Sequence, residues 1–138
     1  MLILLAGERE KGDLRMRVAI CSESTEEQHW MMELLQSCCT KLNVDAEFRL
    51  FQKRERFILS HGEHPFDLII VAFEGANGQE AVLHAKRLYH NCQLIWASRD
   101  RMFALQGYRI GIESFLLKPI DPQLLTKNFC VCVQKYLS

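Results

Sequence analysis

Residues 65–78 read PFDLIIVAFEGANG, a stretch in which a buried strand runs into a turn. After Asp67, Leu68 to Ala72 form an uninterrupted apolar run, and Phe73 then leads into Glu74 and a glycine-containing segment. A short apolar run bounded by turn signals predicts a strand that is buried on both faces. Ligands of parallel sheets usually bind at the carboxyl ends of the strands. Here that end supplies an alanine, and no polar side chain comes before Glu74.

Strand and helix patterns alternate along the chain on both sides of this stretch. The predicted strands are Arg17–Cys21, Asp45–Phe51 (nearer a sheet edge), Leu68–Ala72, Gln93–Ser98 and Glu113–Leu117. The predicted helices are one that begins at Ser24, Lys53–His61, Gln79–His90, Arg101–Gly111 and one that begins at Asp121. Five strands, each followed by a helix, predict an α/β domain with a doubly wound parallel sheet and helices on both faces.

The helix ends carry specific signals. Ser24 is a predicted N-cap with Glu27 completing a capping box, and Asp121 caps the last helix with Pro122 at its first position. Gly111 is a predicted C-cap. Apolar residues at helical spacing predict core-facing seams on three helices, made of Met31, Leu34, Leu35, Cys38 and Leu42; of Ala81, Ala85 and Leu88; and of Leu125, Phe129, Cys132 and Tyr136.

The composition excludes several classes of partner. The chain has 138 residues, with 17 Lys and Arg balanced by 17 Asp and Glu, so no net charge points to nucleic acid or an anionic membrane. No apolar run is long enough to cross a bilayer, and the opening MLILLA is followed by charged residues that do not suit a secretory signal. We therefore expect a cytoplasmic protein, with residues 1–15 as a leader or arm and residues 16–138 as one domain.

The six cysteines do not form a disulfide or metal pattern. Cys38 and Cys39 diverge around a helix, as do Cys130 and Cys132, so neither pair shares a face. They are expected to be small buried side chains. The His61–His64 segment, HGEH, lacks the spacing that places two helical ligands together, so it is expected to be a solvated loop. We expect no metal and no cofactor.

The ends of the strands resemble a known family. GIESFLLKPID, residues 111–121, resembles the final strand and Lys-Pro turn of response-regulator receiver domains of bacterial two-component systems. FALQGYRIGIESFLLKPID, residues 103–121, is similar in particular to receivers of the LytTR type. The resemblance spans about Met16 to Leu137. It implies a flavodoxin-like (βα)5 fold with the strand order 2-1-3-4-5.

The resemblance also implies a set of site residues. In that family an aspartate that ends the third strand accepts a phosphoryl group from a histidine kinase, and it holds Mg²⁺ together with an acidic pair after the first strand. A Ser or Thr after strand four and a lysine before proline contact the phosphoryl group, and an aromatic residue on strand five changes rotamer. Ser98, Lys118, Pro119 and Phe115 stand at these last positions.

The remaining positions depart from the family. Ser22 replaces the first acid, Glu23 retains the second, and Ala72 falls on the position of the acceptor aspartate. A methyl group is no nucleophile and no Mg²⁺ ligand, and one carboxylate makes a weak Mg²⁺ site. Glu74 could replace the acceptor only from two residues further along, so phosphorylation there is not favoured. We instead expect Lys118 to pair with Glu23 or Glu74.

These features predict a pseudo-receiver, a non-enzymatic domain that signals through protein contacts without phosphorylation. The resemblance implies a partner or dimer face made of helix four, strand five and helix five. On that face we expect contacts from Arg101, Gln106, Tyr108, Arg109, Lys127 and Gln134. An alternative is the receiver part of a LytTR-type transcriptional regulator whose DNA-binding domain lies outside this chain. A third is a flavodoxin-like domain that binds a flavin or small molecule, or uses Cys21 in redox chemistry, although the acidic SESTEE after the first strand would repel phosphate.

Overall fold

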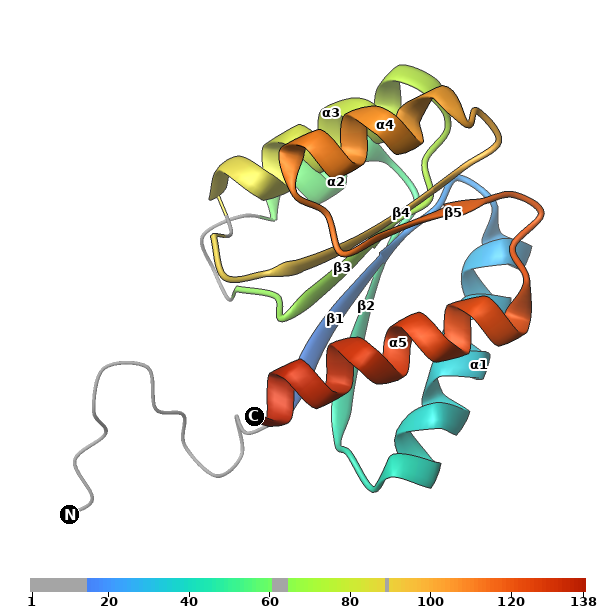
Figure 1. Ribbon diagram of the computed structural model, residues 1–138, viewed down its shortest axis with the longest axis vertical. Helices are drawn as coiled ribbons and strands as arrows, with labels where there is room; N and C mark the ends of the chain where they lie inside the picture. Colours follow the sequence, from blue (N-terminus) through green and yellow to red (C-terminus); the bar gives the residue numbers. More distant parts are fainter. Residues whose placement is uncertain (1–14, 61–64, 89) are drawn as a thin grey trace, which may run out of the picture.

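The computed structural model describes residues 15–60, 65–88 and 90–138, so most of the leader and the His61–His64 segment lie outside the described residues. Within the described part, five parallel strands alternate with five helices and form one sheet in the order β2-β1-β3-β4-β5, which confirms the predicted flavodoxin-like topology (Figure 1). The elements are β1 Met16–Cys21, α1 Thr25–Leu42, β2 Ala46–Phe51, α2 Arg54–Leu59, β3 Leu68–Val71, α3 Gly75–Leu88, β4 Gln93–Ser98, α4 Met102–Ile110, β5 Ser114–Leu117 and α5 Pro122–Leu137.

The strand β3 lies at the centre of the sheet between β1 and β4. Ile69 is paired with Ala19 on one side and with Leu94 on the other. The Asp67 carboxylate, just before β3, accepts a hydrogen bond of 2.7 Å from the Arg17 backbone N–H and so fixes the start of the strand against β1. The strands run in parallel, so the residues that follow β1, β3, β4 and β5 meet at one edge of the sheet.

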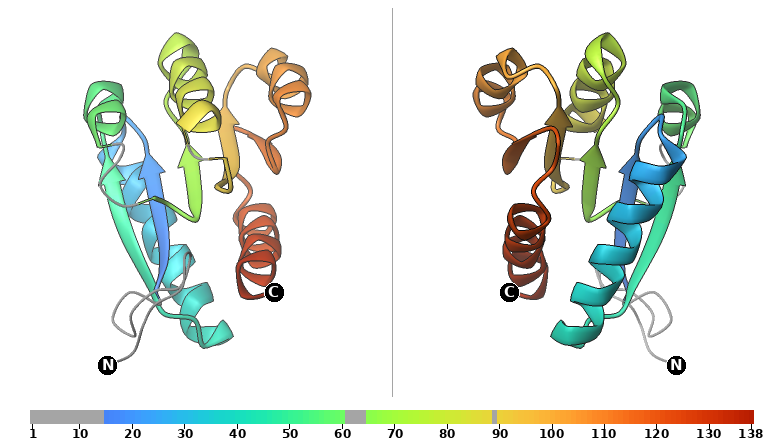
Figure 2. Two further views of the ribbon diagram at one scale, coloured as in Figure 1. Left: turned by 90° about the vertical axis from the view of Figure 1, so that its left-hand side faces the viewer. Right: turned by 90° about the vertical axis from the view of Figure 1, so that its right-hand side faces the viewer.

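Two helical layers cover the sheet. The helices α1 and α5 cover one face, and α2, α3 and α4 cover the other (Figures 1 and 2). Leu68, Ile70 and Ala72 belong to the α1–α5 core, whereas Ile69 and Val71 belong to the core under the other three helices. Both faces of β3 are therefore buried, which explains why its apolar run shows no alternation.

The predicted helix signals are largely confirmed. The Ser24 hydroxyl accepts from the Glu27 N–H at 3.1 Å, and the Asp121 side chain accepts from the Gln123 N–H at 2.9 Å with Pro122 beginning α5. Gly111 has a φ of 87° as the C-cap of α4, a conformation that glycine adopts without strain. The capping box is only half formed, because no hydrogen bond from the Ser24 N–H to the Glu27 side chain is found and that N–H donates to Ser22 instead.

The start of α3 corrects the sequence prediction. This helix begins at Gly75, not at Gln79, so the segment read as a turn is the first helical turn. Gly75 has a φ of 58°, which lets the chain bend sharply out of the strand. A Cβ at Gly78 would lie 2.2 Å from the Phe73 carbonyl oxygen, so the helix approaches the strand end too closely for any other residue. In the sequence, Gly75 and Gly78 indicated a loop, although in the structure they allow the bend and the close packing at the start of α3.

Two seam residues are also placed differently from the prediction. Leu42 is 39% exposed and Leu88 is 43% exposed, so neither belongs to the core. Each is the last residue of its helix. No helix within residues 15–60, 65–88 and 90–138 is long and apolar enough to span a membrane.

Candidate functional site

Lys118, which follows β5, is the centre of a charged cluster at the carboxyl edge of the sheet. Its side chain is only 7% exposed. The ammonium donates to the Ala72 carbonyl oxygen at 2.7 Å and forms ion pairs with Glu27 Oε1 at 3.0 Å and Glu74 Oε2 at 2.7 Å. A nearly buried ammonium is costly unless its hydrogen-bonding capacity is used, and three acceptors match its three N–H groups. The site therefore holds its cation with groups of its own chain.

Glu74, in the connection from β3 to α3, binds three donors with one carboxylate. Its Oε1 accepts from the Ser98 hydroxyl and from the Arg99 backbone N–H, both at 3.1 Å, while Oε2 meets Lys118. Burial acts to raise the pKa of this carboxyl. The hydrogen bond and the positive charge of Lys118, together with the hydrogen bonds from the Arg99 backbone and the Ser98 hydroxyl, nevertheless hold the pKa below its ordinary value. The stability gained from the charged form is therefore present above the ordinary glutamate pKa and is lost as the pH falls through the lowered one.

Glu27 joins the cluster from the first turn of α1. Its Oε1 accepts from the Ser22 hydroxyl at 2.8 Å as well as from Lys118. Ser22 is 1% exposed and also accepts from the Ser24 N–H at 3.1 Å. The sequence reading assigned Glu27 to the capping box and missed its role here. Its role could have been predicted from its position, because Glu27 lies in the first turn of a helix that begins at the same edge of the sheet as Lys118.

Glu23 does not reach Lys118. Its Oε1 accepts from the Glu74 backbone N–H at 3.1 Å, and its Oε2 accepts from the Asn77 side chain at 3.4 Å. Of the two pairings expected for Lys118, the one with Glu74 is formed and no pair with Glu23 is found. Glu23 instead fixes the backbone from which the Glu74 side chain extends.

Ala72 contributes only its backbone to the site. Its methyl group is fully buried in the α1–α5 core. Its N–H donates to the Cys21 carbonyl oxygen at 2.7 Å, and its carbonyl oxygen accepts from Lys118. The end of the central strand thus offers no side-chain oxygen for acyl transfer or for metal binding.

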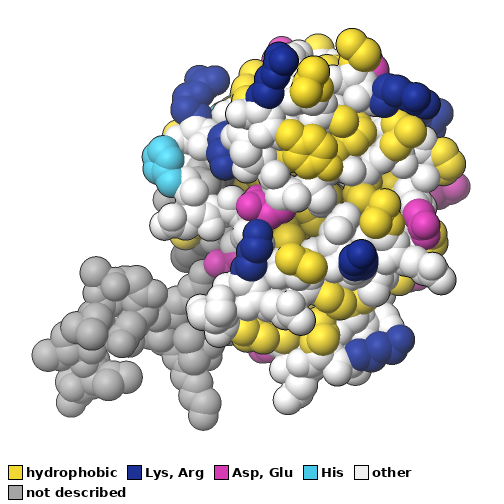
Figure 3. All heavy atoms as spheres, viewed as in Figure 1, with side chains coloured by type: hydrophobic (Ala, Val, Ile, Leu, Met, Phe, Trp, Pro, Cys, Tyr) yellow, Lys and Arg dark blue, Asp and Glu magenta, His cyan; other side chains and the backbone are white. Residues whose placement is uncertain are grey.

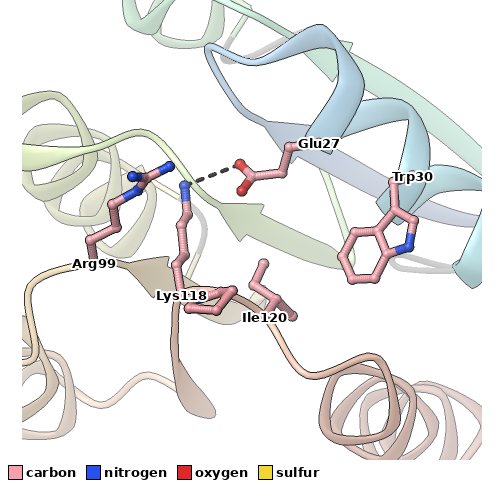
Figure 4. A pocket seen from close by; sticks show the side chains of 6 residues that line it. Glu27, Trp30, Arg99, Lys118 and Ile120 are labelled. Atoms are coloured by element: carbon pink, nitrogen blue, oxygen red, sulfur yellow. Dashed lines mark hydrogen bonds and ion pairs between the residues drawn. The ribbon is translucent and has the colours of Figure 1, made fainter.

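An open groove of about 580 Å³ borders the cluster between α1 and the β5–α5 connection. It is lined by Glu27, Trp30, Arg99, Lys118, Pro119 and Ile120. Figure 4 shows the Lys118 ammonium pointing toward Glu27 and the Trp30 ring directed toward Ile120. Trp30 is 37% exposed, so the groove has one charged end and one apolar end.

The aromatic residues behind the site differ in burial. Trp96 is 1% exposed and lies in the core, where it stacks on Phe103 with ring centres 4.9 Å apart. Phe115 is half-buried and packs against this core from its margin, because β5 is an edge strand. Its ring lies 6.1 Å from Trp96 in an edge-to-face contact, and its backbone N–H donates to the Tyr108 hydroxyl at 3.4 Å.

The predicted partner face is mostly exposed. Arg101 just before α4, Tyr108 and Arg109 on α4, and Lys127 and Gln134 on α5 all face solvent. Gln106 does not belong with them, because it is half-buried and accepts from the Gln79 side chain at 3.0 Å. Sequence reasoning missed the large apolar side chains that are exposed on the same elements, namely Met102, Leu105, Leu117, Leu124 and Val131. Figure 3 shows hydrophobic side chains along this face with Lys and Arg side chains around them.

Burial disfavours redox chemistry at most of the cysteine thiols. All six are free, and only Cys130 is not buried. Burial raises the pKa of the Cys21 thiol well above its ordinary value, and the neighbouring Cys92 adds to the shift. Cys21 also belongs to the core under α2, α3 and α4, not to the site. Within the described residues, no group of three or more His, Cys, Asp or Glu side chains could hold a metal ion.

Thiol labelling of the native protein is expected to modify Cys130 first and Cys21 among the slowest. A buried thiol with a raised pKa presents little thiolate to the reagent. Mass spectrometry after timed exposure to iodoacetamide at neutral pH measures the order, and labelling in denaturant serves as the control for intrinsic reactivity. Rapid modification of Cys21 alone would restore the redox alternative.

Comparison with known proteins identifies the fold of the chain but no family. Neither a protein-family model nor a curated protein sequence matches the chain. Among solved structures, the receiver (REC) domain of AraT, a response regulator from Geobacillus stearothermophilus, is 20% identical with a TM-score of 0.74, over 88% of this chain and 95% of that one. Chemotaxis response regulator CheY4 of Vibrio cholerae is 17% identical with a TM-score of 0.67, over 86% and 98%.

A full regulator also matches. The response regulator DrrB of Thermotoga maritima, an OmpR/PhoB homologue, is 17% identical with a TM-score of 0.71 over 88% of this chain. The match covers 54% of DrrB, so the chain spans about half of that regulator. The protein therefore has the fold of response-regulator receiver domains.

Proposed function

We propose that this protein is a pseudo-receiver, a signalling domain that acts through protein contacts and takes no phosphoryl group. The observation that carries the proposal is the closed cluster at Lys118. The hydroxyl and the ammonium that would contact a phosphoryl group, on Ser98 and Lys118, both bind the chain's own Glu74. A phosphoryl group could enter only by displacing that carboxylate.

We further propose that the protein lacks two other requirements for phosphorylation, an acceptor aspartate and a Mg²⁺ site. Ala72 stands where the acceptor aspartate would be, and Ser22 stands where one acid of the Mg²⁺ site would be. Glu23, the remaining acid of that set, binds the Glu74 N–H and Asn77. Magnesium requires several oxygen ligands in octahedral geometry, and these residues do not supply them. We propose no enzymatic reaction and no cofactor for this chain.

The proposed contact region is the α4–β5–α5 surface, defined by the exposed residues Arg101, Met102, Leu105, Tyr108, Arg109, Leu117, Leu124, Lys127, Val131 and Gln134. Met102 is 74% exposed and Leu105 is 59% exposed, although both are large and apolar. Several large apolar side chains exposed among polar ones on one surface suggest a protein-binding site. We propose a second copy of the chain as the partner, since such a surface can pair with itself about a two-fold axis.

Leu105→Glu is expected to weaken self-association at least tenfold, because a carboxylate buried at the centre of an apolar contact loses its hydration. Sedimentation velocity over a range of protein concentrations measures the effect. Leu59→Glu is the matched control, since Leu59 is 77% exposed on α2 and far from this surface in the fold. Acetyl phosphate with Mg²⁺ should change the association of neither protein. A wild-type monomer at every concentration, or association that acetyl phosphate strengthens, would refute the proposal.

A second candidate is the receiver part of a longer transcriptional regulator of the LytTR type. It is supported by the resemblance of residues 103–121 to receivers of the LytTR type. The match to about half of DrrB, an OmpR/PhoB homologue, illustrates a receiver fold within a longer regulator. In that case any DNA binding would lie outside the described residues. The reading frame downstream of Ser138 distinguishes the two candidates.

A further inference from the structure

We propose that Glu74 is a built-in anionic ligand that occupies the place of a phosphoryl group and holds the start of α4 in one arrangement. This inference rests on the proposed absence of phosphorylation. It adds an explanation of how the domain is kept in one state without a phosphoryl group. It assigns to Glu74 a positioning role that acts through Ser98 and the backbone of the β4–α4 connection.

The contacts of Glu74 are those of a bound oxyanion. Its two carboxylate oxygens collect a hydroxyl donor from Ser98, a backbone N–H donor from Arg99 and the ammonium of Lys118. These donors come from the ends of β4 and β5 and converge on one anion from different directions. Charge-assisted hydrogen bonds of this kind are stronger than those between neutral groups.

The backbone around Glu74 fixes the side chain in this position. The Glu74 N–H donates to Glu23, and Gly75 turns the chain at a positive φ directly into α3. Gly78 then allows the first turn of α3 to pack against the Phe73 carbonyl oxygen. An anion tethered in this way does not lose the translational freedom that a free anion loses on binding, so it should outcompete one.

A chain of hydrogen bonds connects Glu74 to α4. The Ser98 hydroxyl that donates to Glu74 also accepts from the Asp100 N–H at 3.1 Å. The Asp100 carboxylate in turn accepts from the N–H of Met102, the first residue of α4, at 2.9 Å. Loss of the Glu74 carboxylate should therefore change the backbone environment at the start of α4, where the α4–β5–α5 surface begins.

The test is Glu74→Ala, followed by amide NMR without Mg²⁺. We expect shifts at Arg99, Asp100 and Met102, and we expect inorganic phosphate to bind the variant at least tenfold more tightly than the wild type and to reverse those shifts. Glu26→Ala removes the same charge from an exposed position on α1 and should behave as the wild type. Unchanged amides at Arg99 to Met102, or equal phosphate affinity of variant and wild type, would overturn the inference.

Glu74→Gln provides a second variant if Glu74→Ala does not fold. The amide oxygen can still accept from Ser98 and Arg99, but it gives Lys118 no counter-charge. We expect smaller amide shifts and phosphate binding that is still tighter than in the wild type, and wild-type affinity would overturn the inference. Both measurements are non-covalent and free of Mg²⁺, so their failure is distinct from finding that the wild-type protein becomes phosphorylated.

Discussion

Replacing both Glu27 and Glu74 by alanine is expected to lower the free energy of unfolding by about 2–3 kcal/mol. The double variant leaves the Lys118 ammonium, 7% exposed, with the Ala72 carbonyl oxygen as the sole remaining acceptor of the three described. Removing the partners of a buried charge costs more than removing the pair, and the partial exposure of the two carboxylates, 23% and 38%, reduces the loss. Urea denaturation of the wild type and the variants measures it.

The control is to add Lys118→Met to the same double variant. A flexible apolar side chain of similar length has no charge to compensate, and an apolar replacement of a buried ion pair is often neutral. We expect the triple variant to recover most of the lost stability. If the triple variant is no more stable than the double one, the loss comes from packing around α1 and α3 and not from the uncompensated charge.

Ser22→Asp combined with Ala72→Asp is expected to create a Mg²⁺ site where the wild type has none. The two new carboxylates and Glu23 would follow β1 and β3 at neighbouring positions of one sheet edge, which supplies the oxygen ligands that the ion requires. Binding should appear as stabilisation by Mg²⁺, about 2.7 kcal/mol when the ion is 100-fold above its Kd. Without Mg²⁺ the variant should be less stable than the wild type, because the carboxylate introduced at position 22 would face Glu27, which now accepts from the Ser22 hydroxyl.

The matched control for this variant is Ser22→Asp with Ala72→Asn, which has nearly the same shape but one carboxylate fewer. We expect its thermal unfolding midpoint to respond to Mg²⁺ much more weakly. If both variants fold and neither responds to Mg²⁺, the side chain at position 72, which follows β3, faces the α1–α5 core and not the sheet edge, and the acceptor position that the resemblance implies is not carried by Ala72.

The architecture was predictable from the sequence because its signals are local. The apolar run of β3, the caps at Ser24 and Asp121 and the C-cap at Gly111 each depend on residues a few positions apart. Alternation of strand and helix then leaves few topologies, since parallel connections are right-handed. The two helical layers followed from these signals, whereas the strand order 2-1-3-4-5 was implied by the resemblance to receiver domains.

The site was only partly predictable because its contacts are non-local. Lys118 and Ser98 were assigned from the resemblance to receiver domains, but the pairing of Lys118 with Glu27 joins residues far apart in sequence. The choice between Glu23 and Glu74 depended on the bend at Gly75, which the sequence reading treated as a turn. Gln106 was assigned to the surface because a side-chain bond to Gln79 leaves no trace in the pattern of either helix.

The measurement that tests the central claim most directly is intact-mass spectrometry of the wild-type protein after incubation with acetyl phosphate and Mg²⁺. We expect the mass to stay that of the unmodified chain, because Ala72 offers no acceptor oxygen and Glu74 already occupies the donors of Ser98 and Lys118. Ser22→Asp with Ala72→Asp and Glu74→Ala, treated in the same way, shows whether the reagent can modify this fold once the donors of Ser98 and Lys118 are free. A stoichiometric gain of one phosphoryl group on any carboxylate of the wild type would contradict the account.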